Sequence, residues 1–584
     1  TPADMATRDY AYNTNWYEEM IKNAPITQSN INISGGTDKV SYFISAGYLY
    51  QGGIWSTNST DKNRFNFRSN LDADILKNLK LSVGVGAVIN SLNYPRSASY
   101  EIARKMKDMA PNIPVKWPGH DDYYAFGGEG TVNPMALADK EASGYSKKIA
   151  KNLNVDFSLE YKVPFVEGLS LKATMGYTQS DSWNKNWNMN IVYMGYREDA
   201  QEYYESVSAS NANKASLSLE DGFSYNITGQ GFINYIRSFG NHNINSGLVF
   251  EFSDAENRST VTSRGEFPST VLDMMAGGIA NKQVTNSEVF RKYRTASFIG
   301  RFSYDYRSKY FVDFNFRYDG AQYFADKWGF FPSISAAWVV SEEKFMKRLP
   351  VVDNLKFRIG YGLAGNQSGI DSYTTLNLVK PNGVVPVGNS AVVSLGDLRN
   401  TNPDLKWEVK HTFNTGFDVA LFGNRLLLSA NYYNSRTTDM LYLYNVSVPP
   451  FTYNTLLANI GSMRNWGTEI AIGITPLKTK DMELNINANV TFQRNKLLSL
   501  SGMYNGEMIS APEYKSLASL DGAGFHGGYN HIVYQMVGQP LGVFYLPHST
   551  GLVSDGNGGY TYGIADLNGG GVNLEDGEDR YVAG

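Results

Sequence analysis

Residues 153–162 read LNVDFSLEYK, an unbroken alternation of apolar and polar side chains. Successive side chains of a β-strand point to opposite faces of the sheet, so this stretch predicts a strand with one apolar face and one wet face. The same alternation recurs over residues 310–319 and 482–493. About sixteen such segments can be counted, each close to the 9–11 residues that a tilted membrane-spanning strand needs. The sequence therefore predicts an all-β fold.

Alternation alone is equally typical of a soluble β-sandwich, and the lengths of the connections decide between the two. Short turns, such as 74–78, 239–241 and 307–308, alternate with much longer connections. Outer-membrane barrels have this pattern, with short periplasmic turns and long extracellular loops. We therefore predict a transmembrane antiparallel β-barrel over residues 1–584. Its long outer loops are expected at 91–150, 179–226, 253–291, 364–407, 436–465 and 494–584.

The composition excludes several other classes of protein. The 584 residues carry a net charge of -4 without any block of Lys or Arg, which argues against a nucleic-acid partner. Cysteine is absent, so thiolate metal sites and disulfide scaffolds are excluded. No run of 18 apolar residues is present, which excludes membrane helices. The 40 Tyr residues, many near strand ends, are interpreted as membrane-interface girdles, with ordinary sheet tyrosines as the alternative.

No catalytic or metal-binding constellation can be recognised, so we predict no enzyme, no cofactor and no metal. The six histidines show no pairing at metal-ligand spacing. One acidic segment, Asp566-Leu567-Asn568 with Asp579 further on, is similar to a calcium loop. Gly570 replaces the third acidic ligand, and the spacing is longer than an EF-hand allows. A solvated acidic turn is therefore favoured over a calcium site.

Several motifs in a fixed order resemble one known family. They include Asn15-Trp16, Ser34 to Lys39, Arg317 to Gly320, Trp328 to Ser333, Ser341 to Phe345, Asn402 to Glu408, Asn459 to Gly461 and Gly538 to Gly542. Together they are similar to the SusC/RagA class of TonB-dependent outer-membrane transporters of Bacteroidota, over almost the whole chain.

The resemblance implies a barrel of 22 strands around a plug domain, of which this chain holds about sixteen. The plug, the N-terminal region that contacts TonB and the last strands are then expected outside residues 1–584. The implied location is the bacterial outer membrane, in contact with membrane lipid. The implied function is TonB-dependent import of oligosaccharides or oligopeptides, together with a SusD-like surface lipoprotein. The alternatives are a non-transporting barrel for glycan binding or adhesion, and a soluble β-rich glycan-binding protein.

Aromatic residues of the expected outer loops are the candidate ligand contacts. Trp117, Tyr123 and Tyr124 lie in one loop, and Trp183 and Trp187 in the next. Flat rings stack on sugars or pack against peptides, and rigid aromatics often anchor interfaces. The same residues could equally pack the loops together or contact the lid lipoprotein, and the sequence leaves this open.

Overall fold

The computed structural model describes residues 12–583 apart from 129–130, 198–199, 201, 208–214, 280–282, 325, 369, 371–373, 505–506, 511–513, 520–530, 555, 557, 568, 571 and 573–579. In these residues 18 strands are hydrogen-bonded into one antiparallel sheet. Sixteen of them have between 11 and 24 residues, and two are short. The predicted all-β antiparallel architecture is confirmed. No helix in the described part of the chain is long and apolar enough to cross a membrane.

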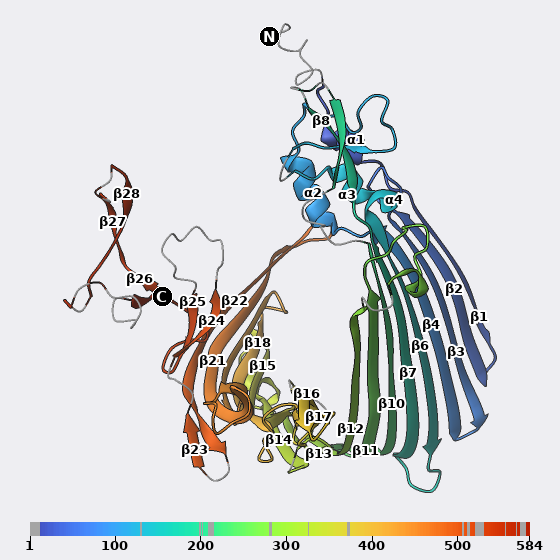
Figure 1. The fold of residues 1–584 in the computed structure, drawn as a ribbon. Helices are drawn as coiled ribbons and strands as arrows, with labels where there is room; N and C mark the ends of the chain where they lie inside the picture. The colour runs from blue at the N-terminus through green and yellow to red at the C-terminus, as the bar shows by residue number, and fades with distance from the viewer. Residues whose placement is uncertain are drawn as a thin grey trace. The chain divides into compact units, whose positions relative to one another are not determined.

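The chain divides into two compact units, and the first comprises Thr1–Val166, Ser170–Phe232 and Glu251–Arg294. Its strands follow one another as antiparallel neighbours (Figure 1). They are β1 (Ile26–Gly36), β2 (Val40–Gly52), β3 (Asp61–Leu76), β4 (Leu79–Pro95), β6 (Gly144–Lys162), β7 (Leu169–Asn188) and parts of β10 (Ser216–Phe239), β11 (His242–Arg264) and β12 (Gln283–Tyr306).

The register of the first unit keeps its two faces chemically distinct. Val155 of β6 lies opposite Val85 of β4 and Tyr177 of β7, and neither ladder contains a register shift. We call the side of the sheet that carries Val155 the Val155 face, and the opposite side the Asn154 face. Phe157, on the Val155 face, is 43% exposed. Such a row of exposed apolar side chains is typical of a surface that contacts lipid.

The strands are longer than the sequence predicted. Pairing continues beyond the alternating segments, so that β4 ends only at Pro95 and β6 begins at Gly144. Polar residues on both faces hide the alternation here, but backbone hydrogen bonding does not depend on it. The connections within the expected loops 91–150 and 179–226 are correspondingly shorter, since β7 runs to Asn188 and β10 starts at Ser216.

A small mixed layer is built from the connections of the first unit, and we call it the loop cluster. It contains α1 (Trp16–Met20), α2 (Ser99–Asp108), β5 (Tyr124–Ala125), α3 (Pro134–Ala138), α4 (Lys140–Ser143), β8 (Val192–Arg197) and β9 (Glu202–Val207). Strands β5, β8 and β9 form a separate sheet in which β5 and β8 are parallel. In Figure 1 the cluster lies at one end of the strands β1 to β4, β6, β7 and β10.

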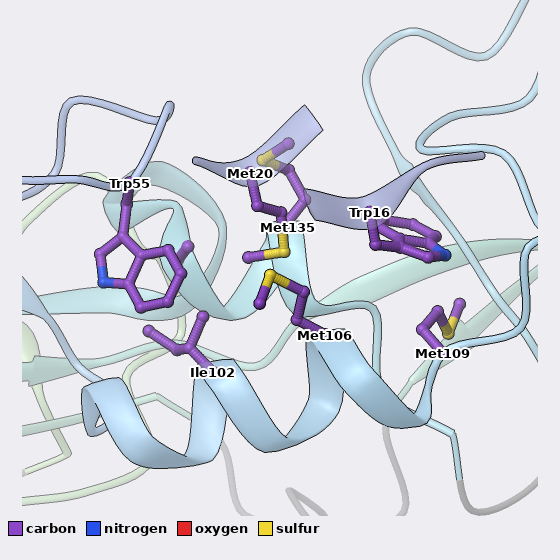
Figure 2. Packing of buried hydrophobic residues seen from close by; sticks show 8 residues of the cluster. Trp16, Met20, Trp55, Ile102, Met106, Met109 and Met135 are labelled. Carbon is purple, nitrogen blue, oxygen red and sulfur yellow. The ribbon is translucent and has the colours of Figure 1, made fainter. Parts of the chain in front are cut away.

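The helices of the loop cluster pack around a common apolar core. Ile102 and Met106, one helical turn apart on α2, are buried and point toward Met20, Trp55 and Met135 (Figure 2). Residues at this spacing share one face of a helix, which explains why a single stripe of α2 is apolar. In this core, α1 packs against the connection between β4 and β6.

The second unit comprises Glu167–Leu169, Ile233–Phe250 and Thr295–Gly584. Its long strands after β12 are β13 (Tyr310–Ala321), β14 (Trp328–Val339), β15 (Val352–Asn366), β18 (Glu408–Leu421), β19 (Leu426–Thr438), β21 (Thr455–Lys478) and β22 (Glu483–Tyr504). Short strands β20 (Leu441–Asn445) and β23 (Glu507–Ser510) extend the pairing of β21 and β22.

Smaller sheets lie outside these ladders. They are the hairpin of β16 (Val379–Val387) and β17 (Ser390–Asp397), the hairpin of β27 (Ser549–Ser554) and β28 (Tyr560–Ile564), and a sheet of β24 (Tyr514–Ser519), β25 (His531–Met536), β26 (Val543–Pro547) and β29 (Arg580–Ala583). Three 3-10 turns complete the described structure, namely η4 (Met275–Gly277), η5 (Val340–Glu342) and η6 (Met346–Arg348).

Two consecutive connections depart from the alternation of short and long connections. The connection from β13 to β14, 322–327, belongs to the long series but is short. The connection from β14 to β15, 340–351, belongs to the short series but contains η5 and η6. The others keep the predicted order, with β18 joined to β19 by residues 422–425 and β21 to β22 by residues 479–482.

Candidate functional site

The Asn154 face of the first unit forms a polar wall around a recess of about 510 Å³. Each strand contributes every second residue to this wall, because side chains alternate between the faces. The polar side chains that line the recess are Gln28, Asn30, Arg64, Asn66, Arg68, Asn70, Asn154 and Asp156. Asparagine amides both donate and accept hydrogen bonds, so the wall can satisfy a polar chain in many orientations.

Glycines give the recess its depth. A Cβ atom on Gly47 would lie 2.5 Å from Oδ1 of Asn30 and 2.7 Å from Nδ2 of Asn66, so only glycine lets these two amides approach across β2. Gly84 and Gly86 of β4 also line the recess. With no side chains at these positions, the polar atoms of the neighbouring strands stay accessible.

Two arginines provide positive charge on this wall. Arg64 and Arg68 of β3 lie four residues apart on the same face and are both exposed. In the described part of the chain, no carboxylate lies within 4.0 Å of the Arg64 guanidinium. An exposed guanidinium can bind a carboxylate with two parallel hydrogen bonds. The wall therefore combines neutral hydrogen-bonding groups with an anion-binding position.

Trp117, one of the predicted ligand contacts, is buried in the loop cluster. Its side chain is 6% exposed, and its indole Nε1 donates to the backbone oxygen of Met194 at 2.8 Å. The rings of Tyr12, Tyr196 and Tyr203 surround it at centroid distances of 5.7 to 6.2 Å. This environment favours the packing alternative for Trp117.

Tyr123 and Tyr124 belong to the same cluster but are only half buried. The Tyr124 hydroxyl donates to Asp139 at 2.7 Å, and burial together with this hydrogen bond raises the pKa of Tyr124 above its ordinary value. The Tyr123 hydroxyl donates to Glu205 at 2.9 Å. Both rings keep some exposed area, so ligand contact at these positions stays a prediction.

Trp183 and Trp187 lie on β7, four residues apart on the Val155 face. Trp187 is 3% exposed and packs edge-on against Phe267 at a centroid distance of 4.8 Å. Trp183 is half buried and lines a different cavity, of about 900 Å³. The five predicted residues thus form two groups, and none of them lines the recess on the Asn154 face.

The polar wall itself was not singled out from the sequence. The alternation in residues 153–162 places Asn154 and Asp156 on the polar face of one strand. It does not show which polar residues of other strands lie next to them. The acidic segment for which the sequence favours a solvated turn over a calcium site lies mainly outside the described residues, since of Asp566, Asn568 and Asp579 only Asp566 is described. In the described part of the chain, no three His, Asp or Glu side chains are grouped as metal ligands.

Comparison with known proteins identifies relatives of this architecture. Residues 111–575 match the family model described as TonB dependent receptor-like, beta-barrel. The chain is 27% identical to TonB-dependent receptor P3 of Formosa agariphila, over 95% of this chain and 53% of the relative. It is 25% identical to TonB-dependent receptor SusC of Bacteroides thetaiotaomicron, over 86% of this chain and 49% of the relative. The chain spans about half the length of the curated relatives it matches.

The fold also has a counterpart among solved structures. The RagAB peptide transporter superimposes with a TM-score of 0.74 at 20% identity, covering 98% of this chain and 60% of that chain.

Proposed function

The chain belongs to the TonB-dependent receptor-like β-barrel family, and from this premise we propose that it is the barrel part of an energy-coupled outer-membrane importer. Family membership places the protein in the bacterial outer membrane. The observation that carries the proposal is the family match over residues 111–575, combined with a sheet that is apolar on the Val155 face and polar on the Asn154 face. In a barrel, these faces contact lipid and line the interior.

The cargo we propose is an oligosaccharide or an oligopeptide. The amides and guanidinium groups of the Asn154 face suit either ligand class, since sugars offer hydroxyl groups and peptides offer amides and carboxylates. One similar structure belongs to a peptide transporter, and it supports the fold of the proposed importer. A plug domain within the barrel would use the same polar wall for its own hydrogen bonds.

The partners we propose are TonB, reached through a plug region, and a SusD-like lipoprotein over the outer loops. In this arrangement the proton gradient of the inner membrane supplies the energy through TonB. The barrel then needs no catalytic residue of its own. Its role is to hold the plug and to present the loops to the lid.

Uptake of labelled ligands by cells that carry or lack the full-length protein tests this function. We expect cells with the protein to accumulate a labelled oligosaccharide or oligopeptide, and expect accumulation to stop when TonB is deleted or a protonophore collapses the gradient. Affinity purification of the full-length protein in mild detergent should recover a lipoprotein in equal amount.

The outcomes separate import from surface binding. Ligand retained at the cell surface in equal amount with and without TonB, and never internalised, would establish the glycan-binding or adhesion barrel instead. Repeated purification of the barrel alone would contradict the proposed lid.

A further inference from the structure

Along β4 and β6, the side chains of the Val155 face change from apolar to polar and charged at one end of the sheet. On β4 its apolar residues run from Leu79 to Ile89, ten residues or about 34 Å along a strand, which at a tilt of about 40° is about 26 Å in height. This height matches the apolar band of outer-membrane barrels, which is about 25 Å tall. Ile89 lies opposite Lys151 of β6, and the next β4 residues on this face are Ser91 and Asn93.

The continuation of this face beyond Lys151 has an unbroken register. Ser91 lies opposite Ile149, and Asn93 lies opposite Lys147. Lys147 and Lys151 are therefore on the same side of the sheet as the lipid-facing Val155, but at and above the edge of the apolar band. Lys148, between them in sequence, is exposed on the Asn154 face.

A cavity of about 900 Å³ lies on this part of the face, between β6, β7, β10, β11 and β12 of the first unit. It combines basic, acidic and aromatic side chains. They are Lys147, Lys151, Asp181, Trp183, Asp221, Phe223, Arg258 and Glu288, with Ile149, Ser182, Gly222 and Thr260 completing the lining.

The basic side chains of the cavity form no ion pairs with carboxylates of the described residues. In the described residues, no carboxylate lies within 4.0 Å of the Lys147 or Lys151 ammonium or of the Arg258 guanidinium. Arg258 instead lies over the Phe223 ring, with Cζ 5.6 Å from its centroid. On β12, by contrast, Arg294 pairs with Asp254 at 2.7 Å. The cavity thus keeps cationic groups available just above the lipid edge.

We propose that this cavity binds the phosphorylated sugar headgroup of an outer-leaflet glycolipid. Its position leaves a lipid headgroup as the natural occupant, because the face below it is the one that contacts acyl chains. Lys147, Lys151 and Arg258 would bind the phosphate oxygens through charge-assisted hydrogen bonds. The half-buried ring of Trp183 offers a flat surface for a sugar.

The acidic residues of the cavity define the ligand further. Asp181, Asp221 and Glu288 balance the three basic groups, so the site does not attract every anion by net charge. Their carboxylates accept hydrogen bonds, which sugar hydroxyl groups can donate. A headgroup with both phosphates and hydroxyls therefore fits better than a bare phosphate.

Lipid binding to the full-length receptor in mild detergent tests this site. The probe is lipid A, a phosphorylated glucosamine disaccharide with acyl chains, and bound copies are counted by native mass spectrometry during titration. We expect the triple variant K147Q/K151Q/R258Q to bind lipid A at least about tenfold more weakly than the wild type. The matched control Lys148→Gln removes a neighbouring charge on the opposite face and should leave binding unchanged.

Further probes separate the parts of the headgroup. Dephosphorylated lipid A should bind the wild type weakly, and inorganic phosphate should not displace lipid A. Trp183→Ala should weaken binding of lipid A but not of phosphatidic acid, which has a phosphate and no sugar. Because the site faces lipid, none of these results depends on which ligand is imported.

Several results would overturn the proposal. Equal lipid A binding by the wild type and the triple variant would exclude the cavity as a headgroup site, as would an equal loss in Lys148→Gln. Displacement of lipid A by inorganic phosphate would indicate a general anion site. A triple variant that binds lipid A normally but changes its oligomeric state would assign the surface to contacts between copies.

Discussion

At the scale of single residues, Asp273 ties an outer connection to the strands below it. Lys185 of β7 lies 2.8 Å from its carboxylate, and the Tyr145 hydroxyl at the start of β6 donates to it. Burial alone raises the pKa of Asp273, but the hydrogen bonds from Lys185 and Tyr145 outweigh burial and hold the pKa below its ordinary value. The charged carboxylate is therefore the form that anchors residues 265–279.

We expect Asp273→Asn to loosen this connection while leaving the sheet intact. Loss of the charged hydrogen bonds should lower the free energy of local opening by about 1–2 kcal/mol, a figure reduced for partial solvent screening. Hydrogen exchange of residues 265–279 measures the effect. Asp121→Asn, an exposed loop carboxylate, is the matched control. Unchanged exchange in Asp273→Asn would show that contacts other than those of Asp273, such as Phe267 packing and the hydrogen bond from Arg264 to the Met275 oxygen, hold the connection.

The same carboxylate predicts how the connection responds to pH. Because the folded pKa is lowered, the stabilisation is fully present above the ordinary Asp pKa of about 4 and is lost as pH falls through the lowered value. Hydrogen exchange of residues 265–279, corrected for the intrinsic pH dependence, should therefore accelerate only below about pH 4. The Asp273→Asn variant should lack this acid-dependent step.

At the scale of elements, the strands could be predicted from the sequence and the loop cluster could not. Residues 153–162 reveal a strand because neighbouring side chains face different solvents. Helix α2 carries only Ile102 and Met106 as buried residues, a stripe too short to stand out within a long polar connection. Its partners Trp16 and Trp55 are distant in sequence, so the shared core is a tertiary property.

The same limit applies to the predicted ligand contacts. The sequence predicts Trp117 and Trp187 as ligand contacts because both are aromatics near long connections, but the structure buries both against residues from other connections. Met194, which accepts the hydrogen bond from Trp117, lies 77 residues further along the chain. No local pattern distinguishes such a ring from one that faces a ligand.

Replacement of Trp117 separates packing from ligand contact. We expect Trp117→Ala to destabilise the loop cluster by about 3–5 kcal/mol, because it removes a buried ring and its hydrogen bond. Hydrogen exchange should increase in residues 113–126 and 192–197, with the long strands β1 to β4, β6 and β7 unaffected. Tyr100→Ala, at a 71% exposed position of α2, is the control and should change little. Weaker ligand binding with normal exchange would instead assign Trp117 to the ligand.

At the scale of the whole molecule, the alternation of the strands and their connection lengths made the membrane-barrel prediction possible. The sequence predicts about sixteen strands, and the main sheet of the described residues contains sixteen long ones, because an apolar and a polar face impose a two-residue period on each strand. The predicted strands are too short, since Lys147 and Lys151 interrupt the apolar row of β6 while the ladder with β4 continues. We therefore interpret the boundary between apolar and charged residues on the Val155 face as the lipid edge, because strand pairing continues beyond it.

This interpretation predicts a specific pattern of lipid accessibility along β6. Residues 1–584 contain no cysteine, so once any cysteine outside this range is replaced by Ser, substituting residues 147–161 one at a time with Cys gives each position of the full-length receptor in bilayers a single spin label. Oxygen concentrates in lipid and polar nickel complexes in water, so relaxation by each reagent reports the surroundings of the label. We expect oxygen accessibility to alternate, with maxima at 153, 155, 157 and 159. At Lys151 and Lys147 the preference should change to the nickel complex, because these residues lie at and above the lipid edge. Maxima at the even positions would place lipid on the Asn154 face. Oxygen maxima that continue through Lys147 would place the cavity around Trp183 among the acyl chains, and would contradict its assignment to the level of the lipid headgroups.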